Sequence, residues 1–449
     1  MAETHIQAVE SEPENEATPL LLTEQTENPE NPEGKAANCT YPDDTHLAKA
    51  LERLEFFLIL LGFNQSSVPR LVLSWGFFSV LALALPLLIL QLSDCAACEA
   101  AQIKSFEIGI VISQACLAAA ALLCLSHNLR KYGVRKFLFV DRYAGHEERF
   151  SQQYIHKISG SLRLLVLWVL PCFILKTARE VFRILYVHRG SWWESAAILL
   201  AFLLSWTYVT VVFLSACVLF HLVCNLQIIH FDDYVKLLER EPDVSLLINE
   251  HVLLRYNLSK ISHRFRMYLL LEFVIVTGSQ FATLFQTTGY TGIITYVNSA
   301  DFVVSSIVQV SGVILCLYAA AKISHRAESI GSLASTWHAL ATCSTDEASQ
   351  IRYSTGMGNM EAANISSSFY MNSSESDLES GLFIVEPTNV QLASDMSSYH
   401  KREALVMYLQ SNPGGITIFG YTVNRGLINT IFFIQLSLIT FVLGMTLVL

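Results

Sequence analysis

The sequence predicts an all-helical protein that crosses a membrane seven times. Of its 449 residues, 52% are hydrophobic and 15% are charged, and the mean hydropathy is +0.42. These values are typical of polytopic membrane proteins. Seven apolar stretches are each long enough for one bilayer crossing. The expected spans are 71–92, 108–125, 162–184, 196–226, 268–285, 302–321 and 427–449.

The first fifty residues differ in composition from the rest. Residues 1–45 are acidic and nearly free of aromatic side chains, and residues 1–50 hold most of the excess behind the net charge of -10. Such a segment buries too little apolar surface to offset its ordering entropy, so we expect a disordered cytosolic tail. Within it, Glu16, Leu20 and Leu21 fit an acidic dileucine sorting signal. The remaining chain is close to neutral, which leaves no basic surface for nucleic acid.

The membrane domain is expected to occupy residues 46–449. In residues 46–63, apolar positions recur at helical spacing with charges on the other face. This pattern predicts an amphipathic helix along the membrane surface. The connection after the first span holds Cys95 and Cys98. These two cysteines would form a disulfide if the connection is extracytosolic, or they would stay reduced.

Helices are expected to extend into the cytosol from the fourth, fifth and sixth spans. Residues 230–240 continue the fourth span, and residues 246–265 join the fifth without a break, with apolar residues at roughly helical period. Residues 343–399 are rich in Ser, Asn and Met and lack periodicity. We therefore expect a disordered cytosolic loop there. Helix resumes at 400–410, and Gly414-Gly415 breaks the chain before the last span.

Lysine and arginine are unequally distributed between the connections. The second, fourth and sixth connections carry many of them, whereas the first, third and fifth carry few. Basic residues accumulate on the cytosolic side of membrane proteins. The even connections are therefore expected in the cytosol, together with the N-terminus, and the C-terminus is expected on the opposite side.

Motifs of soluble enzymes do not occur in the chain. It contains no HExxH, GxSxG or Walker sequence, and its thirteen histidines and ten cysteines show no metal-ligand spacing. Most cysteines lie in apolar segments, where they pack as small hydrophobic residues. We expect neither an enzyme nor a bound metal or cofactor.

Glu272 is an ionisable residue near the inner end of the fifth span. Carboxylates inside membranes are commonly functional. A second interpretation is that Glu272 reaches the interface or pairs with Arg264 and Arg266, which lie within about two helical turns. The sequence leaves both interpretations open.

Gln435 lies near the middle of the last span, where an amide must find a partner or water. In one interpretation the span packs against its neighbours and Gln435 bonds to one of them. In the other it lines a pore, because helical spacing places Gln435 on one face with Ile428, Ile431, Phe432, Leu438 and Ile439. A single helix cannot enclose a lumen, so the pore interpretation requires an oligomer.

The segment Phe419 to Leu427, reading FGYTVNRGL, followed by Gln435, resembles the insect gustatory and odorant receptors. It resembles the plant gustatory receptor-like family more closely. The resemblance implies a homotetrameric ligand-gated cation channel. It also implies that the last span lines the pore, that the cytosolic helices join the subunits, and that the other six spans form a ligand pocket.

Specific residues can be carried over from this resemblance. Gln435 matches the pore glutamine, and Phe432 and Leu436 match the hydrophobic constriction, with Ile428 and Ile439 on the lining face. The pre-pore motif corresponds to Gly420, Tyr421, Asn424 and Arg425, and the implied ligand pocket includes Trp206, Tyr208 and Gln280. The insect signature has Thr-Tyr before the glutamine and Phe after it, where this chain has Ile428, Asn429 and Leu436.

The expected function is therefore that of a ligand-gated, non-selective cation channel subunit. Its expected partners are further copies of itself, the lipid bilayer, a small-molecule ligand and cations. One alternative is a non-conducting receptor or scaffold that signals through its cytosolic helices. Another is a small-molecule transporter, which should show paired internal repeats. The plasma membrane and an endomembrane such as that of the vacuole both remain open as locations.

Overall fold

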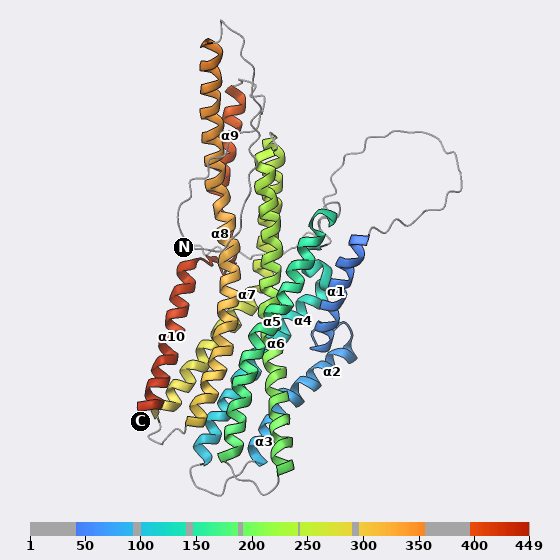
Figure 1. Cartoon of the computed structure of the whole chain (residues 1–449), viewed down its shortest axis with the longest axis vertical. Coiled ribbons are helices and arrows are strands. Elements are labelled where there is room, and N and C mark those ends of the chain that lie inside the picture. Colours follow the sequence, from blue (N-terminus) through green and yellow to red (C-terminus); the bar gives the residue numbers. More distant parts are fainter. Residues whose placement is uncertain are drawn as a thin grey trace, which may run out of the picture. The chain divides into compact units, whose positions relative to one another are not determined.

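The structure is a computed structural model, and it describes residues 42–92, 100–140, 147–186, 192–240, 243–289, 296–354 and 396–448. They lie in one compact unit, Pro42–Leu449. Seven helices among them are long and apolar enough to cross a membrane, which confirms the predicted fold class (Figure 1). The elements are α1 Pro42–Leu60, α2 Val68–Ser79, π-helical η1 Val80–Ala84, α3 Leu85–Leu92, α4 Ala100–Phe137, α5 Glu147–Tyr186, α6 Trp192–Arg240, α7 Val244–Gly289, α8 Tyr296–Ser354, α9 Met396–Ser411, β1 Thr417–Ile418, β2 Tyr421–Thr422 and α10 Arg425–Val448.

Several sequence-based predictions concern residues outside these ranges. The disordered tail is one of them, except that its last residues, from Pro42 on, begin α1. The sorting signal of Glu16, Leu20 and Leu21 is another, and so is the cysteine pair Cys95 and Cys98. These predictions stay predictions.

Helix α1 packs its apolar stripe against the protein. Leu47, Leu51, Leu54 and Leu58 are all buried, and the helix contacts α5. The sequence predicted this helix, but it predicted that the apolar face would lie along a membrane surface. The face instead joins the main hydrophobic core. Amphipathic periodicity shows that a face is apolar, and it does not show what covers that face.

The chain turns sharply between α1 and the first span. Gly62 has a φ of +85°, and the amides of Gly62 and Phe63 bond back to the carbonyls of Ile59 and Leu58. This is the hydrogen-bond pattern of a Schellman cap, which favours glycine at the left-handed position. The Ser74 hydroxyl then donates to the Gly62 carbonyl at 2.7 Å, which joins the turn to α2.

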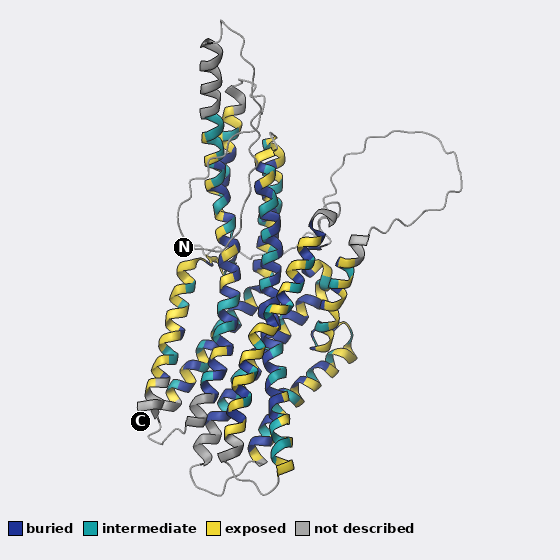
Figure 2. Cartoon of the chain, viewed as in Figure 1, coloured by how far each residue is buried: buried dark blue, intermediate teal, exposed yellow. Residues whose placement is uncertain are grey.

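Helix α6 occupies the centre of the bundle. It contacts α4, α5, α7 and α8, and most of its length is buried (Figure 2). Its continuation to Arg240, and the unbroken course of α7 through the predicted range 246–265 and the fifth span, confirm two of the predicted extensions. Helices α6 and α7 therefore extend without a break from the membrane segment into the region beyond it.

Two segments between the predicted spans contain helix. In the second connection, α4 continues to Phe137 and α5 already begins at Glu147. At the predicted loop 343–399, α8 runs on to Ser354 and α9 begins at Met396, so the loop boundaries were wrong. Charged residues lower the local hydropathy, but they do not prevent an amphipathic helix that packs on its neighbours.

A small hairpin, instead of a simple break, leads from α9 into α10. Strand β1 pairs with β2 across Phe419 and Gly420, which both have positive φ, of 48° and 89°. Two such residues form the tight turn typical of two-residue hairpins. The hairpin is fastened to the bundle because the amides of Ile416 and Thr417 donate to the hydroxyls of Ser324 on α8 and Ser262 on α7.

Candidate functional site

Helix α10 rests on the bundle along one stripe. It contacts α7 and α8 (Figure 1). Gln435 and Val442 are buried in this stripe, and Ile428 and Ile431 are half-buried beside them. The Gln435 amide donates to the Thr277 hydroxyl on α7 at 2.9 Å. The single chain thus provides the neighbour that one interpretation of Gln435 required.

The remaining surface of α10 is exposed (Figure 2). At 100° per residue, Phe432, Leu436 and Asn429 fall on one flank, and Ile434 and Phe441 fall on the other. The exposed large apolar residues of α10 are between 36% and 65% exposed, the highest value belonging to Phe433. An exposed apolar helix face suits lipid or a second subunit, whereas an exposed amide such as that of Asn429 needs water or a polar partner.

The predicted pore residues therefore divide between two sides of α10. Phe432 and Leu436 lie on the exposed side, where another subunit or a lumen can reach them. Gln435, Ile428 and Ile439 lie toward the chain's own bundle, with Gln435 only 1% exposed. Helices α7 and α8 cover the stripe that contains Gln435. The assignment of all five residues to one pore lining stays a prediction about an oligomer.

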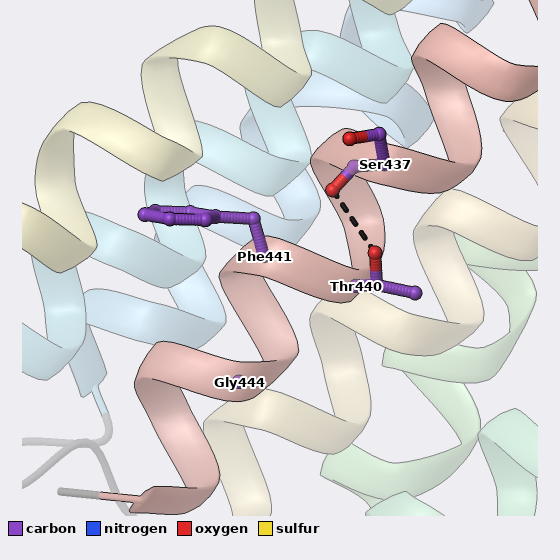
Figure 3. Close-up of a pocket in the computed structure, with 4 residues that line it drawn as sticks. All are labelled: Ser437, Thr440, Phe441 and Gly444. Carbon is purple, nitrogen blue, oxygen red and sulfur yellow. Dashed lines mark hydrogen bonds between the residues drawn. The ribbon is translucent and has the colours of Figure 1, made fainter.

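An open depression lies on α10 near the C-terminal end. Its volume is about 400 Å³, and it is lined by Ser437, Thr440, Phe441 and Gly444 (Figure 3). The Thr440 hydroxyl donates back to the carbonyls of Leu436 and Ser437, so it is satisfied within the helix. The depression exists because Ser437 and Gly444 are small residues. Small residues allow close approach between membrane helices.

The pre-pore motif shapes the entry into α10. Gly420 occupies the hairpin turn, and Tyr421 lies in β2 with 79% of its side chain exposed. Asn424 precedes the first helical residue, Arg425, and its side-chain oxygen accepts a hydrogen bond from the Leu427 amide at 2.9 Å. Asn424 is thus the N-cap of α10, which satisfies one of the free amides of its first turn.

A narrow cavity lies among α3, α4, α5, α6, α8 and η1. Its volume is about 20 Å³, which is room for about one water. Trp206 lines it, and the indole Nε1 of Trp206 has no hydrogen-bond partner among the described residues. The other lining residues are Ala82, Pro86, Ile110, Val111, Gln114, Lys176, Phe202, Ser205, Val209 and Asp301.

Tyr208 and Gln280, the other two residues predicted for a ligand pocket, do not line this cavity. Tyr208 packs edge-on against Phe77 of α2, with ring centroids 5.3 Å apart. Gln280 on α7 is 1% exposed, and neither of its amide atoms has a partner among the described residues. The structure therefore keeps Trp206 at the cavity and separates the other two from it.

A buried cluster of five charged residues borders the cavity, and the sequence analysis missed it. Lys176 bonds to Asp301 and lies 3.1 Å from Glu180. Arg179 lies 2.6 Å from Glu180 and 2.7 Å from Glu107. None of the five side chains is more than 6% exposed. Burying charges is costly unless they are paired, so the charges of α4, α5 and α8 must stay in contact with one another.

A signal for this cluster was present in the sequence. Glu107 and Asp301 directly precede the second and sixth predicted spans, and Lys176, Arg179 and Glu180 lie in the final part of the third. The alternation of spans places all of these ends on one side of the membrane. Opposite charges at neighbouring span ends therefore indicated the pairing, whereas hydropathy alone treated them as boundaries.

Polar side chains continue from the charged cluster along α8. Gln309 accepts a hydrogen bond from Ser279 on α7 at 2.9 Å and donates to Ser113 on α4 at 3.3 Å. Gln114 donates to Ser305 at 3.0 Å. These bonds connect α4, α7 and α8 inside the predicted membrane segment, where a buried polar group needs a partner.

Comparisons with known proteins agree with this architecture. A family model described as "Protein of unknown function (DUF3537)" matches residues 49–434. No curated protein matches the chain. The solved structure of the insect olfactory receptor OR5 from Machilis hrabei in complex with eugenol aligns with a TM-score of 0.53 and 12% identity, over 90% of this chain and 99% of that one.

A second structure of that receptor aligns with a TM-score of 0.47 and 10% identity, over 89% of this chain and 98% of the receptor chain. At 12% identity, the first likeness shows a shared fold and nothing narrower. The chain is therefore similar to insect olfactory receptors in the arrangement of its seven membrane helices.

Proposed function

The chain belongs to the family described as protein of unknown function (DUF3537), and from this premise we propose that it is a subunit of a ligand-gated, non-selective cation channel. Four copies would surround a central pore lined by α10. The narrower relationship that we propose is with the plant gustatory receptor-like proteins. Support comes from the fold that it shares with an insect olfactory receptor whose structure was solved with eugenol.

One observation carries the proposal, namely the way α10 is held. A helix that served only to complete the bundle would be covered on several sides, as α6 is. Only 11% of the most apolar stretch of α10 is buried, and the exposed part carries Phe432, Leu436 and the amide of Asn429. Apolar side chains near a polar ring can close a pore by dewetting, and Phe432 and Leu436 are the residues that we propose for this constriction.

The proposed ligand site is the narrow cavity at Trp206. Its volume of about 20 Å³ is too small for an organic ligand, so binding requires that the surrounding helices separate. Lys176 and Asp301 reach the cavity from α5 and α8, and α8 also supports α10. A ligand that binds the widened state more tightly would shift the population toward it and move the seat of α10.

We further propose the orientation that the basic residues predict. The N-terminus, α9 and the long ends of α6, α7 and α8 would lie in the cytosol, and the C-terminus outside it. The hairpin before α10 is bonded to Ser262 and Ser324, so movements of the cytosolic helices would be transmitted to α10. The membrane would be the plasma membrane or an endomembrane such as that of the vacuole.

The rival function is a receptor that signals without conducting. The hydrogen bond from Gln435 to Thr277 favours this rival, because it gives Gln435 a packing role inside one subunit. In a monomeric receptor, the exposed face of α10 would contact lipid and would line no pore. The two functions therefore differ in the mass of the assembled protein.

The first experiment is to purify the full chain in mild detergent and measure the mass of the particle. A tetramer is expected, and a monomer would overturn the channel proposal. Currents are then recorded from membranes containing the protein, with Phe432→Ala and Leu436→Ala expected to raise basal conductance. Ile434→Ala is the matched control, because Ile434 is 45% exposed but lies on the opposite flank. Equal currents in all three variants would refute the assignment of the constriction.

A further inference from the structure

Three acidic or thiol side chains from three helices meet in the interior of the bundle. Cys217 on α6, Glu272 on α7 and Cys316 on α8 each present one ligand atom, and these atoms all lie within 4.8 Å of one another. Within the part of the chain that the structure describes, no other group of three His, Cys, Asp or Glu residues is arranged in this way. The three residues are at most 2% exposed.

Glu272 has no cationic partner among the described residues. It does not pair with Arg264 or Arg266, and it does not reach the interface, so the second sequence-based interpretation was wrong. Its carboxyl oxygen Oε1 accepts a hydrogen bond from the Cys217 thiol, with Sγ 3.5 Å away. A carboxylate buried in an apolar bundle either keeps its proton or has a cation beside it, because an unpaired buried charge costs several kcal/mol.

The two thiols decide which kind of cation suits the site. Sodium, magnesium and calcium prefer oxygen ligands, whereas thiolates select thiophilic ions such as zinc. From this chemistry we propose that Cys217, Glu272 and Cys316 bind a zinc ion. The two thiolates and the Glu272 carboxylate would supply three bonds and three negative charges, one more than the ion balances, and the Tyr268 hydroxyl 3.1 Å from Cys217 Sγ would donate a hydrogen bond to this excess charge. A water molecule would fill the fourth position of the tetrahedron.

The distances agree with a zinc site. Zinc bonds of about 2.3 Å to sulfur and about 2.0 Å to oxygen put tetrahedral sulfur and oxygen ligands about 3.5 Å apart. The observed separation of Cys217 Sγ and Glu272 Oε1 is 3.5 Å. The limit of 4.8 Å on all three pairs also leaves room for the sulfur-to-sulfur edge, which is about 3.8 Å.

Neighbouring residues support the position of Cys217. The Tyr268 hydroxyl lies 3.1 Å from Cys217 Sγ, and beside a thiolate this hydroxyl must be the donor. Such outer hydrogen bonds orient metal ligands. Gly312 on α8 faces Cys217 closely, because a Cβ at this glycine would lie 3.1 Å from Cys217 Sγ and 2.4 Å from Phe213 Cζ. The glycine thus lets α6 and α8 approach at the level of the site.

The site connects the centre of the bundle with the support of α10. Cys217 belongs to α6, while Glu272 and Cys316 belong to the two helices on which α10 rests. A bound ion would therefore link α6 to α7 and α8, the two helices that α10 contacts. The inference does not depend on whether the protein conducts, because its first measurement is metal content.

The test begins with the full-length protein, purified in detergent with a reducing agent and a tag free of histidine. After passage over a chelating resin, zinc is counted by mass spectrometry. We expect about one zinc ion per chain. A zinc-free wild type that also fails to take up added zinc would overturn the proposal, as would a Cys217 to Cys316 disulfide under reducing conditions.

Variants then identify the ligands. Cys217→Ser, Cys316→Ser and the isosteric Glu272→Gln should each weaken zinc binding at least tenfold, and Tyr268→Phe should weaken it about 10- to 100-fold through the lost outer hydrogen bond. The matched control is Cys224→Ser, since Cys224 is also buried in α6 but stands outside the cluster. If Cys224→Ser lost as much zinc as the others, the assigned ligands would be wrong.

Cobalt provides a measurement on the wild-type protein that does not depend on whether any variant folds. Cobalt loaded into the wild-type protein should show a thiolate-to-metal charge-transfer band and the intense visible absorption of tetrahedral coordination. Zinc should displace it and remove both features. A cobalt spectrum typical of six oxygen ligands would overturn the proposal even without any variant.

Discussion

Helices α6 and α10 are both apolar enough to cross a membrane, yet the chain holds them in opposite ways. Half of the most apolar stretch of α6 is buried, compared with 11% for α10. Helix α6 packs on α4, α5, α7 and α8, whereas α10 packs on α7 and α8. Lipid tolerates an exposed apolar side chain, so hydropathy alone does not reveal this difference. Helix α6 is the packed centre of the chain, whereas α10 leaves most of its apolar surface exposed.

The largest effect is expected from truncation in α6. Phe220 is fully buried, and its ring centroid lies 4.8 Å from that of Phe265 on α7. Phe220→Ala should lower the free energy of unfolding by about 3–5 kcal/mol, because it leaves a cavity in packed surroundings. Thermal unfolding in detergent measures the change. A loss below about 1 kcal/mol would break the comparison, because α6 would then not be the packed centre.

A smaller loss is expected where α10 contacts the bundle. Gln435→Leu removes the hydrogen bond to Thr277 and should cost about 0.5–1.5 kcal/mol. Thr277→Val should cost a similar amount, and the double variant should cost little more than either, because both changes remove one bond. The same unfolding assay measures all three variants. If the losses of the two single variants added up in the double variant, Gln435 and Thr277 would contribute to stability through separate contacts.

The N-cap of α10 has an effect of comparable or lower size. Asn424→Ala removes the bond to the Leu427 amide and should reduce stability by about 1 kcal/mol, whereas Asn424→Asp retains an acceptor and should be close to neutral. Hydrogen exchange of the first turn of α10 reports this change locally. Equal protection in the alanine variant and the wild type would mean that the hairpin alone positions the helix.

The smallest effect on the single chain is expected on the outer side of α10. Phe433 is 65% exposed, so Phe433→Ala should change the free energy of unfolding by less than about 0.5 kcal/mol. Its effect should instead be on assembly, seen as a fall in particle mass in detergent. An unchanged mass would indicate that this side faces lipid, and would leave Phe432 and Leu436 as the residues to test for contact between subunits.

The membrane segments could be predicted with confidence from local composition. All seven predicted spans coincide with helices, and α6 and α7 run on beyond them as their apolar spacing indicated. The bounds of the predicted loop 343–399 were wrong, because α8 runs on to Ser354 and α9 begins at Met396. Hydropathy averages over a helix, so it does not separate an amphipathic helix covered on one face from a solvated loop.

The sites depended on relations that no local pattern contains. The resemblance assigned Trp206 to a ligand pocket, whereas Lys176 and Asp301, which line the narrow cavity with Trp206, were not singled out. Cys217, Glu272 and Cys316 lie on three helices, at spacings that match no metal-binding motif. Each residue taken alone gave no sign of a metal site. Only their proximity in the structure indicates that they could bind a metal ion together.

By itself, the sequence determined which segments cross the membrane, because transfer into lipid depends on each segment's own side chains. It also contained the motif around Asn424 and Arg425 that led to the receptor-like fold. The tertiary structure alone decided that Gln435 turns toward Thr277 while Phe432 and Leu436 turn outward. The rotation of a helix about its axis is set by the shape and polarity of its neighbours, which come from distant parts of the chain.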